Sequence, residues 1–251
     1  MVGDEKMFFK CILVERLKTK RQRFWLIAVF IPMLSILLGL MNFYFNYNVL
    51  VQSGDNEWLE AWTQVTLFYG LLILPILSGV YVSMICRHEH MSGGWKQILA
   101  LPVSKWNIYG AKLLVSWELI LKTQASLLVF YIILGRVSGI KSNIPWGFML
   151  NALFLCLIAA FVLASIQMAF TISLKSFSIP LMINIFCTFM GLPILTLKIR
   201  QIYPWCMPFV AMSAPDEGRI ASFGVFIIAA ITIFILATSI GYFKFKKNCI
   251  D

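Results

Sequence analysis

Few side chains in this sequence are of types that could do chemistry. His88, Glu89 and His90 carry imidazole and carboxylate side chains, which are the types of group that bind zinc in many proteins. Successive residues of a helix point about 100° apart, so these three cannot share one ion as the residues of H-E-x-x-H do. No further ligand of this kind lies nearby in the sequence. We therefore predict no metal site.

The sequence also lacks the motifs of nucleotide binding and of hydrolysis. It contains no G-x-x-x-x-G-K-[ST], and Gly93-Gly94 is followed by Trp95 before Lys96, with no strand before it. No G-x-S-x-G occurs, and Glu118 is the only acid within an apolar run. We therefore expect no catalytic residues and no cofactor in this chain.

Glu118 and Lys122 are the charges that interrupt an apolar run. They lie one helical turn apart and can pair with each other. Charges inside a membrane usually face protein or a water-filled cavity. Two interpretations stay open: a polar patch that lines a translocation path or a dimer interface, and a self-neutralised structural pair.

Hydrophobic helices must position these groups. Hydrophobic residues make up 60% of the sequence and charged residues 13%, against about 25% charged in soluble proteins. Six runs approach the ~20 residues that cross about 30 Å of hydrocarbon as a helix. Pro75 predicts a kink in the second. We predict an all-α integral membrane fold, one transmembrane domain with spans at about 24–45, 62–86, 108–134, 148–173, 178–197 and 222–243.

The distribution of basic residues orients the chain. Of 21 Lys and Arg residues, 15 lie in the segments on the side of the two termini: 1–23, 87–112, 174–177 and 244–251. Basic segments stay in the cytoplasm, so we expect a multi-pass protein of the bacterial cell membrane with both termini inside. This bias accounts for much of the net charge of +10 without a nucleic-acid partner.

Two further segments border the spans. Phe9, Leu13 and Leu17 are spaced by four residues, which favours a helix over 1–23 that lies on the inner leaflet; a frayed tail is the alternative. The segment 198–221 has Tyr203, Trp205 and Phe209 among prolines. It is too apolar for free solvent and too broken to span. We predict that it re-enters the outer leaflet, with an aromatic interface belt as the alternative.

Six cysteines occur without any C-x-x-C pair. Only Cys206 falls in a predicted external segment, so we expect no external disulfide within the chain. We interpret most of them as small apolar side chains of the core. They are Cys11, Cys86, Cys156, Cys187, Cys206 and Cys249.

The stretch 87–112 lies between two apolar runs. Gly93-Gly94 ends the preceding helix, and Trp95, Ile98 and Leu99 then share one face of a short helix that Pro102 stops. A short amphipathic rod of this kind suits a groove on another protein. An ordinary interfacial loop is the alternative.

This order of segments, with E89-x₃-GGWKQILALPVSKWNIYGAKLL between spans two and three, resembles permease subunits of type-2 ABC exporters, in particular those for lantibiotic immunity and bacitracin-type peptide antibiotics. In that family the loop is the coupling helix that contacts the ATPase. Ile98 stands where leucine is common. The resemblance implies an ATPase-coupling interface at Glu89, Trp95, Ile98, Leu99, Leu101 and Pro102.

The resemblance also implies partners. These are two copies of a cytoplasmic ABC ATPase that carries ATP and Mg, a second permease chain, identical or a sister, and an amphipathic peptide substrate. Glu118, Lys122, Tyr203, Trp205 and Phe209 are candidates for contacts on the substrate path or with the second chain. A type-2 permease for another lipid or drug, and an accessory membrane protein outside the ABC class, are the alternatives.

Overall fold

A computed structural model describes residues 2–91, 102–174, 176, 178–214, 220 and 222–247, with side chains from residue 5 onward except at 88 and 91. All regular elements in this part of the chain are helices. They are α1 (Val2–Arg21), α2 (Phe24–Phe45), α3 (Tyr47–Leu50), α4 (Glu57–Phe68), the π-helical turn η1 (Tyr69–Ile73), α5 (Leu74–Met91), α7 (Lys105–Val137), α8 (Trp146–Ser173), α9 (Ser178–Ile194), the 3₁₀ turn η2 (Lys198–Gln201), α10 (Met207–Met212) and α11 (Phe223–Lys247).

The helical composition confirms the prediction of an all-α membrane protein, with a different number of long spans. In the described residues, five helices are long and apolar enough to cross a bilayer: Phe24–Phe45, Glu57–Arg87, Lys105–Val137, Trp146–Ser173 and Phe223–Lys247. The remaining predicted span, 178–197, is the 17-residue helix Ser178–Ile194. That length is at the lower limit for a span, so six spans remain a prediction.

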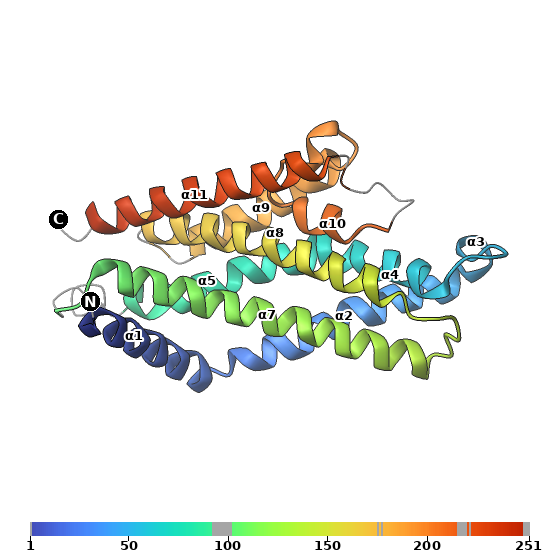
Figure 1. Cartoon of the computed structure of the whole chain (residues 1–251), viewed down its shortest axis with the longest axis horizontal. Coiled ribbons are helices and arrows are strands. Elements are labelled where there is room, and N and C mark those ends of the chain that lie inside the picture. The colour runs from blue at the N-terminus through green and yellow to red at the C-terminus, as the bar shows by residue number, and fades with distance from the viewer. Residues whose placement is uncertain are drawn as a thin grey trace.

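The long helices lie side by side along one axis (Figure 1). Helix α1, the beginning of α7 and the C-terminal end of α11 share one end of this bundle, as drawn at the left. Helices α2 and α7 run parallel, and Ser126 Oγ of α7 donates a hydrogen bond to the Val29 carbonyl of α2 at 2.8 Å. This contact fixes the register between the two helices.

The irregularity expected near Pro75 is the π-helical turn Tyr69–Ile73, directly before it in the chain. Proline has no N–H for the carbonyl four residues earlier, and a wider turn accommodates that loss. Asn184 of α9 donates to the Pro75 carbonyl at 2.9 Å. Gly70 lets α10 approach, because a Cβ there would lie 2.9 Å from Phe209 Cα. Neighbouring helices therefore support the turn.

Aromatic side chains fill the half of the bundle away from α1. Trp58 and Trp62 of α4 have their ring centroids 5.4 and 5.2 Å from that of Tyr131. All three are fully buried, and each polar end has a partner. The Tyr131 hydroxyl donates to the Trp58 carbonyl at 2.7 Å, and the Trp62 indole donates to the Met212 carbonyl at 2.9 Å. The rings therefore contribute apolar area without an unpaired donor.

The described residues of the two bordering segments form helices and turns that pack on the bundle. Helix α1 packs along α7 and buries Ile12, while the predicted stripe Phe9, Leu13 and Leu17 is exposed. In the segment 198–221, α10 is buried against α8 and η1. Both arrangements suit the predicted places in the membrane, which stay predictions.

Most of the described cysteines have the environment expected of small core side chains. Cys86, Cys156 and Cys206 are buried, whereas Cys11 and Cys187 are partly exposed, and all five are free thiols. Cys249 lies outside the described residues.

Gly39 marks a close approach of α2 to α4, and its replacement tests this packing. A Cβ at Gly39 would lie 2.5 Å from Val65 Cα and 2.6 Å from its backbone nitrogen. Gly39→Ala must therefore move the helices apart, and we expect it to lower the free energy of unfolding by about 1–3 kcal/mol. Thermal unfolding in detergent measures the change. Gly147→Ala, where a Cβ meets open space, is the control. Equal midpoints for both variants would refute the close packing.

Candidate functional site

The predicted coupling stretch begins at the end of α5. Glu89 lies two residues before the end of that helix and is buried, with 2% of its area exposed. Trp95, Ile98, Leu99 and Leu101 lie outside the described residues. Pro102 is exposed shortly before α7 begins. The structure therefore shows how the stretch is anchored at its first residue.

Glu89 belongs to a network of four charged side chains that joins three helices. Lys112 of α7 places its Nζ 2.9 Å from Glu89 Oε1 and 3.2 Å from Glu15 Oε1. Lys18 of α1 lies 2.9 Å from the same Glu89 oxygen and 2.7 Å from Glu15 Oε1. The Ile85 carbonyl of α5 also accepts from Lys112 at 3.4 Å. Two ammonium groups and two carboxylates thus alternate around one site.

Burial makes this network decisive for the position of α1. Side-chain exposure is 1% for Lys112, 2% for Glu89 and 7% for Glu15, against 32% for Lys18. A buried charge without a partner is strongly destabilising, so each member requires the others. Within the described part of the chain, the carboxylate oxygens Glu15 Oε2 and Glu89 Oε2 are buried without a hydrogen bond, which makes the charge balance still more important. The network therefore holds α1, α5 and α7 together.

Burial and the two lysines shift the pKa of the Glu89 carboxyl in opposite directions. Burial raises the pKa of its carboxyl, but the ammonium groups of Lys112 and Lys18 outweigh burial and hold the pKa below its usual value. Glu89 is thus ionised at neutral pH. The neighbouring His90 donates a hydrogen bond from its Nε2 to the Thr171 carbonyl of α8 at 3.0 Å. This contact ties the end of α5 to α8 as well.

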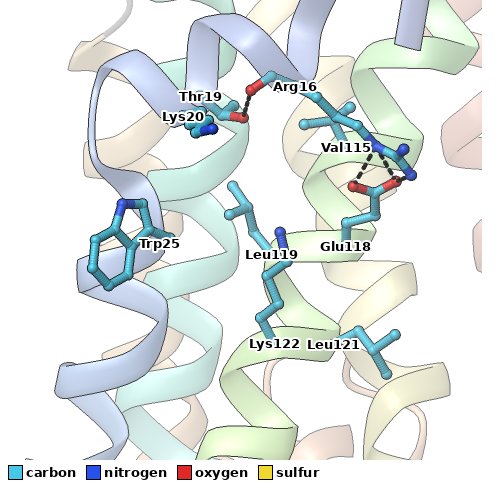
Figure 2. A pocket seen from close by; sticks show the side chains of 9 residues that line it. All are labelled: Arg16, Thr19, Lys20, Trp25, Val115, Glu118, Leu119, Leu121 and Lys122. Atoms are coloured by element: carbon cyan, nitrogen blue, oxygen red, sulfur yellow. Dashed lines mark hydrogen bonds and ion pairs between the residues drawn. The ribbon is translucent and has the colours of Figure 1, made fainter. Parts of the chain in front are cut away.

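The pair predicted within α7 is different in the structure. Glu118 binds Arg16 of α1, whose Nε lies 2.9 Å from both carboxylate oxygens, and not Lys122 (Figure 2). Helix spacing alone suggested the nearer lysine, but α1 brings a bidentate guanidinium that suits a carboxylate better. The pair is partly exposed, with 53% of Arg16 and 28% of Glu118 accessible, so its contribution to stability is about 0.2–1 kcal/mol.

The register of the helices also fixes the depth of Glu118 and Lys122. The Ser126 to Val29 hydrogen bond places Lys122 level with Trp25, because each lies four residues earlier in a parallel helix. Trp25 is in the first turn of α2, the first apolar span. Lys122 therefore lies where that span begins, and Glu118 one turn outside it, at the end of the bundle that carries α1.

The aromatic candidates of the segment 198–221 hold the fold together. The Tyr203 hydroxyl donates to the Cys187 carbonyl at 2.8 Å, and the Trp205 indole donates to Asn184 Oδ1 at 2.9 Å. The backbone of Phe209 contacts Gly70. These residues fix α9, α10 and η1 relative to one another, and none of the three is among the described residues that line a cavity with Glu118 and Lys122.

Three members of the network were missed from the sequence: Glu15, Lys18 and Lys112. The sequence pattern indicates only that Glu15 and Lys18 belong to a basic helix and that Lys112 ends a polar stretch. The sequence separation of 97 residues between Glu15 and Lys112 gives no signal of contact. One signal was available, since Lys112 precedes the apolar run L-L-V, and a lysine there requires an acidic partner.

Comparison with known proteins assigns this arrangement to a class. Residues 11–191 match the ABC-2 family transporter proteins. The match covers most of the chain, and the chain therefore belongs to this family, as a multi-pass membrane permease component of ABC transporters. The resemblance noted in the sequence is confirmed.

The bacitracin transport permease protein BCRB of Bacillus licheniformis is similar to this chain. The two sequences are 26% identical over 198 residues, which cover 74% of this chain and 90% of that protein. No solved structure matches the sequence significantly.

Removal of the most buried charge tests the network. Lys112→Met leaves the carboxylates of Glu15 and Glu89 facing each other with Lys18 alone, and we expect unfolding to become easier by about 3–5 kcal/mol. Thermal unfolding in detergent measures stability, and tryptic cleavage within α1 reports its release. Lys6→Met, at an exposed lysine of α1 outside the network, is the control. A variant at position 112 as stable as the control would show that the network is dispensable.

Acid should release the same contacts. The pKa of Glu89 lies below its usual value of 4.5, so its stabilising effect is complete above that pH and is lost as pH falls through the lowered pKa. We expect the thermal midpoint to hold between pH 7 and about pH 5 and to fall below this range. Glu89→Gln should flatten the acid slope. An unchanged slope in this variant would place the titrating group elsewhere.

Proposed function

We propose that this chain is the permease subunit of an ATP-driven exporter that expels an antimicrobial peptide and so gives its bacterium immunity or resistance. Family membership supports the transport role. The similarity to a bacitracin transport permease supports a peptide antibiotic as the substrate. Both termini lie in the cytoplasm, and a separate ATPase, present twice with two permease chains, binds ATP and Mg.

The observation that carries the proposal is the network around Glu89. The residues expected to meet the ATPase, Trp95 to Pro102, follow Glu89 in the chain. Glu89 is bound on one side to α1 and on the other to α7. A displacement of the coupling stretch by the ATPase would therefore move α5, α7 and α1 together. A plain interfacial loop needs no such anchor of buried charges.

The motion would reach the substrate path through α5 and α7. Helix α5 continues into the π-helical turn at Tyr69–Ile73, which contacts α9 and α10. Beside α10 and α8 lies a cavity of about 280 Å³ with the exposed Asn151 among mostly apolar residues. This cavity is a better place for substrate contacts than Tyr203 and Trp205, whose polar atoms are already bonded within the fold.

Substitutions on the predicted coupling face test the proposal. A carboxylate on the apolar face should prevent docking into the ATPase groove, so we expect Trp95→Asp and Leu99→Asp to reduce co-purification of the ATPase at least about tenfold, since charged residues are depleted at interface cores. Pull-down of the tagged permease measures the retained ATPase, and thermal unfolding checks that the membrane part stays folded.

Gln97→Asp is the matched control. Helical spacing places Gln97 on the opposite face, so the same new charge should leave the complex intact. Full co-purification with both coupling-face variants would overturn the coupling assignment. If no ATPase co-purifies with the unaltered chain, the result would favour the alternative of an accessory membrane protein. A complex that forms but leaves sensitivity to peptide antibiotics unchanged would favour another lipid or drug as the substrate.

A further inference from the structure

A cavity of about 720 Å³ opens between α1, α2 and α7, and the transport proposal makes no use of it. We call it the α1–α7 groove. Figure 2 shows its lining, with charged side chains from α1 and α7 and an indole from α2. Its residues are Arg16, Thr19, Lys20, Trp25, Val115, Glu118, Leu119, Leu121 and Lys122.

The groove lies at the boundary of the bilayer. Lys122 is level with Trp25, through the register that the Ser126 to Val29 hydrogen bond fixes, and α2 becomes an apolar span from Phe24 onward. Tryptophan is typical of the headgroup level. Trp25 exposes 47% of its surface, so its ring faces outward from the bundle. Lipid headgroups therefore lie at the height of this groove.

Two cations of the groove have no ion-pair partner among the residues that the structure describes. Glu118 is occupied by the guanidinium of Arg16. Lys20 and Lys122 are exposed and make no ion pair within the described ranges of the chain. Figure 2 shows the ammonium end of Lys122 directed along α7 toward α1, on which Lys20 lies. A lysine beside hydrocarbon is costly without an anion, and a phosphate between these two groups would supply one.

The remaining surface of the groove is apolar. Val115 and Leu119 line it between the charged residues, and Leu121 exposes 53% of its surface on the side of the span. A ligand that fits has an anionic head for the lysines and a hydrocarbon part for the leucines and the Trp25 ring. A free inorganic anion would use only the first of these features.

We propose that the α1–α7 groove binds an anionic phospholipid of the surrounding leaflet. Its phosphodiester lies between Lys20 and Lys122, and the part of its acyl chains nearest the headgroup lies against Trp25 and Leu121. The bound lipid adds a further link between the C-terminal end of α1 and α7, next to the buried charge network. The site does not depend on which substrate the protein transports.

Titration of the full-length chain with phosphatidylglycerol tests this site. The purified protein in uncharged detergent receives short-chain phosphatidylglycerol or phosphatidylcholine, and the rise of the thermal midpoint gives an apparent dissociation constant. Each lysine near a bilayer surface raises the binding constant for an anionic lipid by a similar factor, and the two factors multiply. Lys20→Gln together with Lys122→Gln should therefore weaken phosphatidylglycerol binding about 30-fold. The variant pair Lys20→Arg and Lys122→Arg keeps the charges and should keep the binding.

The matched control removes the same charge elsewhere. Lys6→Gln with Lys246→Gln alters two exposed lysines outside the groove and should leave the binding unchanged. Equal weakening by the control and by the groove variant would overturn the site in favour of general attraction by positive charge. Displacement of the lipid by millimolar inorganic phosphate, or equal binding of phosphatidylcholine, would likewise overturn it, in favour of a free anion or of a neutral lipid.

A second measurement holds even if the glutamine variant does not fold. Bromine on an acyl chain near the headgroup quenches a nearby indole, so brominated phosphatidylglycerol should quench the unaltered protein more than Trp25→Phe. Brominated phosphatidylcholine should show no such difference. Equal quenching of the two proteins by the brominated anionic lipid would exclude a lipid beside Trp25.

Discussion

The buried alternation of Lys112, Glu89, Lys18 and Glu15 is the constraint on which the α1 end of the molecule depends. Hydrophobic burial alone would allow α1 to slide or rotate along α7, since apolar contacts have no direction. Charges that cannot be left unpaired allow one arrangement only. The same network fixes the end of α5, from which the chain enters the predicted coupling stretch.

Composition and run length predicted most of the fold, because lipid accepts only segments whose backbone groups are satisfied internally. The first span matches its expected bounds, and Pro75 marked a real irregularity. The helix ends were less predictable. Helix α7 begins at Lys105 and ends at Val137, beyond the apolar run on both sides, because a helix can continue outside the hydrocarbon where water accepts its polar side chains.

The candidate site was predictable only in part. Glu89 could be found from the motif that follows it, whereas its partners lie on segments far apart in sequence, and no local rule joins Glu15 to Lys112. For Glu118, the spacing of residues along the helix predicted a pair with Lys122, whereas the packing of α1 on α7 places Arg16 beside its carboxylate. Pairing between distant charges is decided by the way helices dock. Sequence spacing describes only the neighbours on one helix.

Helix α7 has a consequence for how the two ends of the molecule communicate. It is 33 residues long, or about 50 Å at 1.5 Å per residue, and runs unbroken from the charge network to Gly135, where it lies against Trp58. A helix that moves as one rigid piece transmits a tilt along its whole length. A tilt of α7 beside Lys112 would therefore displace its Gly135 end as well, without any contact through a loop.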